Sequence, residues 1–318
     1  MLYTLNMIWN SNGGIELGSL NIRFYSLMFI VAFGLGWYIM KPIFERDGLS
    51  IEKLDNIFVY TVIATLLGAR LGHVFFYDWG YFKDHKLEIL LPIRENANAS
   101  ILGIIQGWEF TGFAGLASHG AAIVIIIAMV IIKKKKIIDK PLLWILDRIV
   151  IPVASGAIFV RLGNFFNSEI VGTQTDSAFG IKFIRDWYSP REAFEKTSIQ
   201  NSNDAYKAIE NNPQFREVLA EVVPKHPAQL YEAFGYVFVF LILFYMYWKT
   251  DARNKQGLLF GTFLVTLWTV RFFVEYVKES QGGFENNPVF SALSTGQWLS
   301  IPFIIVGFYF IYRSLKAK

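Results

Sequence analysis

Seven long apolar runs account for most of this 318-residue chain. They cover approximately residues 22–44, 54–77, 112–132, 142–165, 227–248, 257–277 and 296–312. A helix needs about 20 mostly apolar residues to cross a bilayer. Because a backbone in lipid must satisfy its hydrogen bonds internally, runs of this length predict spanning helices. We therefore expect an all-α integral membrane protein with seven transmembrane helices.

The composition agrees with a membrane protein and leaves little room for a separate soluble domain. Hydrophobic residues make up 53% of the chain and charged residues only 18%, whereas soluble domains are about 25% charged. We expect a single polytopic membrane domain over residues 1–318. Residues 167–225 are rich in Asn, Ser, Asp, Glu and Lys. This stretch is too long for a passive connector, so we expect it to fold as a small extracytoplasmic cap between the fourth and fifth spans.

The short loops predict the orientation, because an excess of Lys and Arg marks the cytoplasmic side. Basic residues follow the first span, the third span ends in the lysine run 133–136, and further basic residues follow the fifth and seventh spans. All of these positions fall on one side, which places the N-terminus outside and the C-terminus inside. The lysine run would also suit anionic lipid headgroups. Residues 1–21 lack the pattern of a cleavable signal, so the first span is expected to be retained.

Almost every polar side chain within the apolar runs falls in the outer half of this topology. A charge at a helix centre costs about 2.5–3.5 kcal/mol on insertion scales, so such groups are rare and usually functional. Their one-sided placement predicts a reaction or binding site that opens away from the cytoplasm. The residues concerned are Arg70, His73, His119, Arg161, Asn164, Arg271 and Glu275.

The densest polar cluster ends the fourth span. Arg161 and Asn164 are three residues apart and should share a helix face, while Asn167 and Glu169 extend the polar row and Gly172 follows. An arginine fork can bind two phosphate oxygens at once, which favours an anionic ligand. A single arginine could instead extend to lipid headgroups at the interface.

Arg271 is the second cation, and Glu275 lies four residues later in the sixth span. This spacing allows an ion pair that neutralises both groups within the helix bundle. It also allows a carboxylate to orient a guanidinium that binds substrate. The two interpretations are compatible.

A histidine supplies the candidate proton carrier. His119 lies about seven residues into the third predicted span, or about 10 Å along the helix, and histidine exchanges protons near neutral pH. A lone histidine on an apolar helix is more often a packed core residue. For Arg70 and Tyr25 structural and functional roles remain equally open, and Gln229 and Glu232 at the start of the fifth span could also face the site.

Several function classes have no support in the sequence. The chain has no cysteine, its four histidines lack metal-ligand spacing, and neither a phosphate-binding glycine loop nor a nucleic-acid footprint is present. The converging arginines favour either an enzyme that acts on a phospholipid headgroup or a transporter or flippase for an anionic lipid or anion. A transporter would favour inverted repeats and interrupted helices at mid-membrane, and the sequence has no convincing internal repeat.

The segment Arg161-Leu-Gly-Asn-Phe-Phe-Asn-Ser-Glu-Ile-Val-Gly172 resembles the signature of the prolipoprotein diacylglyceryl transferase family. Six further blocks resemble that family in the same order along the chain. They are Phe24-Tyr25-Ser-Leu-Met, Gly68-Ala-Arg70-Leu-Gly, Ser118-His119-Gly120, His226-Pro-Ala-Gln-Leu-Tyr-Glu232, Arg271-Phe-Phe-Val-Glu275 and Gly296-Gln-Trp-Leu-Ser-Ile-Pro302.

The resemblance implies a multi-pass enzyme of the bacterial plasma (inner) membrane. It would transfer the diacylglyceryl group of phosphatidylglycerol to the lipobox cysteine of prolipoprotein signal peptides, the first step of lipoprotein maturation, with release of glycerol phosphate and without a cofactor or metal. It implies that Arg161 and Arg271 act in binding and catalysis and that His119 is important. It also implies roles for Tyr25, Asn164, Glu169, Gly172 and Glu275. From their positions alone, we add Arg70 and Asn167 as candidates for substrate binding.

Overall fold

The computed structural model describes residues 7–17, 20–76, 78–91, 93–101, 103–110, 117–280 and 292–316. The chain forms two compact units. The first contains residues 1–40 and 146–318, and the second contains residues 41–145. The boundaries fall within helices α1 (Phe24–Arg46) and α5 (Leu142–Phe166).

Six helices are long and apolar enough to cross a membrane: α1, α2 (Ile51–Phe76), α5, α10 (Ala228–Lys249), α11 with its terminal 3-10 turn (Leu258–Val277) and α12 (Thr295–Lys316). They match six of the seven predicted runs, which confirms a mainly helical, multi-pass membrane protein. The remaining run contains α4 (Ser118–Lys134), whose 17 residues span about 25 Å, whereas the hydrocarbon core is about 30 Å thick. Residues 111–116 of that predicted span lie outside the described residues.

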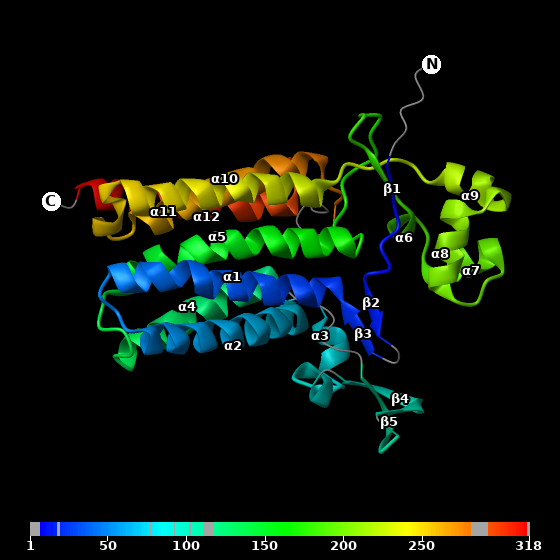
Figure 1. Ribbon diagram of the computed structural model, residues 1–318, viewed down its shortest axis with the longest axis horizontal. Coiled ribbons are helices and arrows are strands. Elements are labelled where there is room, and N and C mark those ends of the chain that lie inside the picture. The colour runs from blue at the N-terminus through cyan, green and yellow to red at the C-terminus, as the bar shows by residue number, and fades with distance from the viewer. Residues whose placement is uncertain are drawn as a thin grey trace. The chain divides into compact units, whose positions relative to one another are not determined.

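In the first unit, α1, α5, α10, α11 and α12 run close to parallel (Figure 1). Small residues set the closest helix crossings. A Cβ atom added to Gly261 would lie 2.7 Å from the carbonyl oxygen of Gly307, and one added to Gly307 would lie 2.8 Å from that of Gly261. Apolar side chains gain little from leaving lipid, so close backbone approach is a main source of helix association in membranes.

Residues 181–221 form short elements beyond the end of these helices that lies away from the C-terminus (Figure 1). They are β6 (Ile181–Phe183), α6 (Ile184–Trp187), α7 (Pro190–Thr197), α8 (Ser202–Asn211), η2 (Pro213–Phe215) and α9 (Arg216–Glu221). A small apolar core that includes Ile184, Tyr188 and Tyr206 holds them together. The N-terminal strand β1 (Met7–Trp9) pairs in parallel with β6. A hairpin of β2 (Gly14–Leu17) and β3 (Leu20–Arg23) then leads into α1.

The second unit packs α2 against α4 at three glycines. A Cβ atom on Gly120 would lie 2.6 Å from the Cα atom of Gly72, and one on Gly68 would lie 2.6 Å from the carbonyl oxygen of Gly120. Any side chain at these positions would therefore separate the two helices. The polar stretch after α2 contains regular structure: α3 (Trp79–Phe82), η1 (Lys86–Ile89) and a hairpin of β4 (Ile93–Ile101) and β5 (Ile105–Phe110).

Three two-stranded sheets therefore accompany the helices in the described part of the chain. The sequence obscured β4 because its Asn-Ala-Asn-Ala-Ser segment has low strand propensity. Pairing with the apolar and aromatic residues of β5 outweighs that preference. Gly103, at a φ of 71°, supplies the left-handed turn between the two strands.

Candidate active site

The last turns of α5 present a buried polar face. Arg161 Nη1 donates to Asn164 Oδ1 at 3.2 Å, and both residues are buried. This contact confirms that the two side chains share a helix face. The helix ends soon afterwards, where Ser168 and Ile170 adopt left-handed backbone angles. These turns therefore carry a guanidinium into a largely water-free environment.

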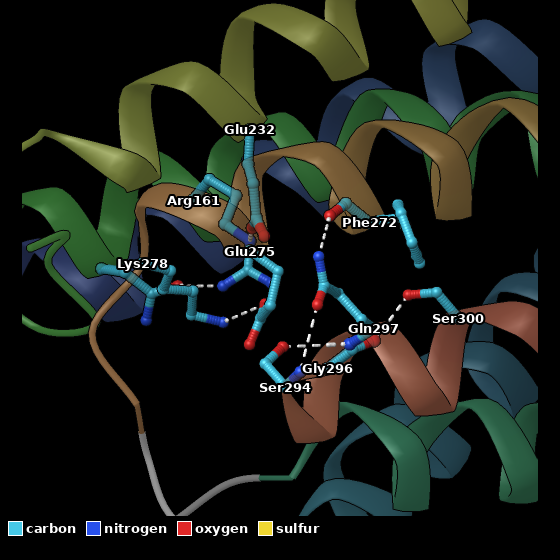
Figure 2. Close-up of polar contacts among 10 residues, drawn as sticks. Arg161, Glu232, Phe272, Glu275, Lys278, Ser294, Gly296, Gln297 and Ser300 are labelled. Carbon is cyan, nitrogen blue, oxygen red and sulfur yellow. Dashed lines mark hydrogen bonds and ion pairs between the residues drawn. The ribbon is translucent and has the colours of Figure 1, made fainter. Parts of the chain in front are cut away.

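Across from this face, α10 supplies the counter-charge. Arg161 Nε forms an ion pair with Glu232 Oε2, and the Glu232 side chain is only 2% exposed. Figure 2 shows the two side chains directed toward one another. Tyr236, one turn further along α10, is also buried beside Arg161. Removing one member of a buried pair strands the other charge, so this pair is a strong constraint on the site.

A row of amide and carboxylate groups continues from Asn164 toward the end of the helices. Asn164 Nδ2 lies 3.5 Å from Glu169 Oε2, and Asn167 Nδ2 donates to Glu169 Oε1 at 3.3 Å. The backbone carbonyl of Glu169 accepts a 2.7 Å hydrogen bond from Gln229 Nε2. The predicted polar row therefore exists, and it is tied to the start of α10.

Tyr25, in the first turn of α1, reaches this row because Gly163 has no side chain. A Cβ atom on Gly163 would lie 2.7 Å from Cδ2 of the Tyr25 ring. The ring packs on the α5 backbone, and its hydroxyl interacts with Asn164 and with the charges of Glu169 and Arg161. The structure thus brings Tyr25 to the same cluster as the α5 residues.

Arg271 approaches from α11. Among the described residues, its Nε atom is buried and has no hydrogen-bond partner, and its guanidinium carbon lies 5.5 Å from the Trp268 ring centroid. The charges of Arg271 and Arg161 both act on Tyr236 and on Lys278. The two arginines therefore belong to one electrostatic cluster, with unused donor capacity on Arg271.

Glu275 has a different partner from the one that its spacing suggests. Helix α11 ends at Val274, and residues Glu275–Val277 form a 3-10 turn. A 3-10 turn places residues three apart on the same face, and Lys278 Nζ lies 3.2 Å from Glu275 Oε2. Within the described residues we find no ion pair between Arg271 and Glu275, so the i,i+4 pair that the spacing allows does not form there.

The Glu275 carboxylate rests against the first turn of α12. A Cβ atom on Gly296 would overlap this carboxylate, so a side chain at this position would displace it. Ser294 and Gln297 cap the helix reciprocally, with Ser294 N donating to Gln297 Oε1 at 3.0 Å and Gln297 N to Ser294 Oγ at 3.2 Å. Figure 2 shows Glu275 between this turn and Lys278.

Gly172 lies where three chain segments meet. Its amide donates to His226 O at 2.8 Å, and it forms an antiparallel bridge with Lys278. A Cβ atom here would lie 2.6 Å from His226 Cβ and would also overlap Val277 O. Gly172 therefore allows the segment after α11 to approach the segment after α5, which fixes the backbone of Lys278.

The second unit holds the other two predicted site residues. Arg70 is buried, donates to the backbone carbonyls of Ile89 and Glu88, and lies 4.7 Å from the Phe82 ring centroid. These contacts give Arg70 a structural role in holding η1 against α2, while its role in substrate binding remains a prediction. His119 is in the first turn of α4, because Ala117 is extended and the helix begins at Ser118. The expected depth of about 10 Å along the helix is therefore wrong.

Two groups of buried charge escaped the sequence prediction. Lys278 follows a predicted span and resembles an ordinary interfacial lysine, although its side chain is only 4% exposed. Burial lowers the pKa of its ammonium group, and the charge of Arg271 lowers it further. Asp147 and Arg148 are also buried, near the opposite end of α5 from Arg161. Their charges within an apolar run were a signal that could have been noticed.

These observations define a multi-pass membrane protein with a buried, charged site near one end of its helices. Residues 13–313 match the family model of prolipoprotein diacylglyceryl transferase. The chain belongs to this family.

Three relatives illustrate how far the similarity extends, and each is a phosphatidylglycerol–prolipoprotein diacylglyceryl transferase. The Bacteroides fragilis protein is 33% identical over 99% of this chain and 97% of its own length. The Chloroherpeton thalassium protein is 33% identical over 95% of this chain and 91% of its own length. The Tolumonas auensis protein is 32% identical over 98% of this chain and 99% of its own length.

Proposed function

We propose that this protein transfers the diacylglyceryl group of phosphatidylglycerol to the cysteine thiol of a prolipoprotein lipobox. The relatives that match it over nearly their whole length carry the name of this activity. The structural observation that supports the proposal is the cluster in which Arg161 is paired with Glu232, while Arg271 Nε is buried and has no hydrogen-bond partner among the residues that the structure describes. Such a cluster suits an anion that arrives from the membrane.

Arg271 is the group with donor capacity for the lipid phosphate. Arg161, held by Glu232 and Asn164, supplies a second fixed positive charge beside it. Guanidinium groups bind phosphate oxygens in pairs and remain charged in an apolar environment. Fixed donors aimed at developing charge are worth more in a water-poor site than in water. We therefore assign both arginines to phosphate binding and to stabilisation of the departing glycerol phosphate.

The reaction exchanges one bond to carbon for another. The thiolate sulfur attacks the diacylglyceryl carbon that carries the phosphate oxygen, so a carbon–sulfur bond forms as the carbon–oxygen bond breaks. The glycerol phosphate leaves with the electron pair, and the thiol proton passes to a base. We assign His119 to that proton, because a histidine is poised to accept it near neutral pH.

The remaining predicted residues act as positioning groups in this proposal. Tyr25, Asn164, Asn167 and Glu169 form the polar row beside Arg161 and would orient the lipid headgroup. Arg70 would contribute to binding as well as to the fold of its own unit.

We also propose the placement of the chain in the bacterial inner membrane. Helix α4, together with the residues before it, would complete seven spans. The loops rich in Lys and Arg would face the cytoplasm, and the N-terminus would lie outside. The segment 167–225 would form an extracytoplasmic cap over the end of the helices that carries the charged site.

The direct test uses purified protein, phosphatidylglycerol with a labelled headgroup, and a synthetic lipobox peptide. We expect the peptide to gain the mass of one diacylglyceryl group on its cysteine and an equal amount of labelled glycerol phosphate to appear. A peptide with serine in place of the cysteine is the matched control. Movement of phosphatidylglycerol between leaflets without a lipidated product would contradict the proposal and favour a flippase.

A further inference from the structure

Glu275 lies between two cations, and it pairs with only one of them. Arg271 precedes it by four residues, the spacing at which a helical ion pair ordinarily forms. Lys278 follows it by three residues and contacts it at 3.2 Å. The choice of partner follows from the 3-10 turn that begins at Glu275, so it is a property of the local backbone.

Separate parts of the fold hold both members of this pair. The segment that carries Lys278 is bound by two hydrogen bonds, Thr173 N to Val277 O at 2.8 Å and Glu279 N to Val171 O at 3.2 Å. The Glu275 carboxylate is confined against Gly296 at the start of α12. The side chains are 4% and 10% exposed. A buried pair held at both ends is a fixed feature, unlike a flexible surface contact.

Among the described residues, the ion pairs around Glu275 leave Arg271 as a cation without a carboxylate partner. Arg161 is neutralised by Glu232, and Glu275 is neutralised by Lys278. Arg271 is then the remaining cation among the charged groups that act on Lys278. The carboxylate of Glu169 belongs to the polar row beside Arg161, where two asparagine amides bind it. A guanidinium without a carboxylate partner is suited to bind the single negative charge of a phosphodiester.

We propose that Lys278 is a positioning residue that holds the Glu275 carboxylate away from Arg271 and so keeps the Arg271 guanidinium available for the lipid phosphate. This inference rests on the proposed function. Without Lys278, the carboxylate would be a buried charge with one nearby cation left, Arg271. Because a buried unpaired charge is costly, Glu275 would turn to Arg271 and compete with the phosphate for the same donors.

The test is a double-mutant cycle of Lys278→Met and Glu275→Gln, with Lys278→Arg as the conservative variant. In the native background, we expect Lys278→Met to raise the KM for phosphatidylglycerol about tenfold, within the range of coupling between contacting residues. The KM for the lipobox peptide should stay unchanged. In the Glu275→Gln background, the same Lys278 substitution should have little effect, because a neutral glutamine cannot capture Arg271. Lys278→Arg should retain the native KM.

Binding of dihexanoyl-phosphatidylglycerol, measured by calorimetry, separates this inference from the proposed function. A protein that binds the lipid with the same mutational pattern but makes no thioether would overturn the function and support the inference. The inference alone would be overturned if the native protein has full transfer activity but the double-mutant cycle shows no coupling between Lys278 and Glu275. The same conclusion would follow if the double variant has a KM for phosphatidylglycerol as high as that of Lys278→Met. Absence of both lipid binding and transfer would overturn the proposed function and the inference.

Lys196→Met, which breaks the exposed Lys196–Glu221 pair, is the control for loss of an ordinary lysine–glutamate contact.

Discussion

Helix α5 carries buried charge near both of its ends, and the two ends use it differently. Near the start, Asp147 accepts hydrogen bonds from the amides of Gly257 at 2.6 Å and Phe260 at 2.8 Å. The neighbouring Arg148 donates to the carbonyl of Arg253 at 3.0 Å. Both residues bind the backbone around the start of α11, so their charge serves the fold.

Near the other end, Arg161 is surrounded by side chains. Its partners are Asn164 and Glu232, and the nearby Arg271 retains a buried donor without a partner among the described residues. Side-chain networks can rearrange around a ligand, whereas a capped helix start cannot do so without unfolding. A buried charge is therefore not sufficient evidence for a binding or catalytic site. The end of α5 that carries the candidate site differs in that its charge is held by other side chains, and not by the backbone at the start of a helix.

Arg161→Ala should give the largest effect and would test the polar end directly. We expect turnover to fall by about 10²–10³-fold, the range found when a charge-stabilising donor is removed. Because Glu232 would then be a buried charge without its partner, the free energy of unfolding should also fall by about 3–5 kcal/mol. Lipidated peptide per folded molecule and a thermal melt in detergent measure the two effects. The double variant Arg161→Ala/Glu232→Gln should recover folding without recovering turnover, and recovery of both would contradict the assignment.

Asp147→Ala should affect stability instead of chemistry. Two amides near the start of α11 would lose their acceptor, and leaving buried donors unsatisfied costs about 1–3 kcal/mol each. We expect a lower melting temperature in detergent with unchanged turnover per folded molecule. A specific loss of turnover in well-folded protein would remove the distinction between the two ends of α5.

His119→Asn should cost less than the loss of Arg161. A thiol of pKa about 8.5 is about 3% ionised at pH 7, so a base that ionises it fully gains about 30-fold at most. The deficit should shrink as the pH approaches 8.5, because the thiol then ionises without help. Initial rates of native and variant protein between pH 6 and about 9 test this, since the range brackets the thiol pKa. A loss equal to or greater than that of Arg161→Ala would contradict the leading role of the arginines.

Lys225→Met should give the smallest effect, because its ion pairs lie outside the membrane helices. Lys225 Nζ contacts Asp186 at 2.7 Å and Glu279 at 2.8 Å. Burial lowers the pKa of this ammonium group, but the two carboxylates outweigh burial and raise the pKa above its ordinary value. A raised pKa means that the pair stabilises the folded state below about pH 10.4, the ordinary lysine pKa, and that the contribution is lost as the pH rises further.

The expected loss of stability for Lys225→Met is about 0.5–1 kcal/mol near neutral pH. Melting curves of native and variant protein should therefore differ near pH 7 and converge at strongly alkaline pH. A constant difference across that range would show that Lys225 acts through packing of its aliphatic stem and not through its charge.

The helices were predictable because their signal is local. Six spanning helices follow from apolar length alone, and the shared face of Arg161 and Asn164 follows from helical spacing. Short polar segments were less predictable, as the β4–β5 hairpin shows, because their strands depend on each other and not on their own propensity. His119 illustrates a similar limit. An apolar run does not reveal the residue at which the helix begins, and the extended backbone of Ala117 moved that point to Ser118.

The amino-acid sequence is enough to predict a helical membrane protein and to indicate the family that it resembles, because apolar length and motif order are properties of consecutive residues. Which charges pair with one another could be learned only from the folded chain. Glu275 pairs with Lys278 and not with Arg271 because α11 gives way to a 3-10 turn, and Gly172 fixes the backbone of that lysine from a segment about a hundred residues earlier. The energy of a buried charge depends on what surrounds it in space, and sequence spacing gives only part of that information.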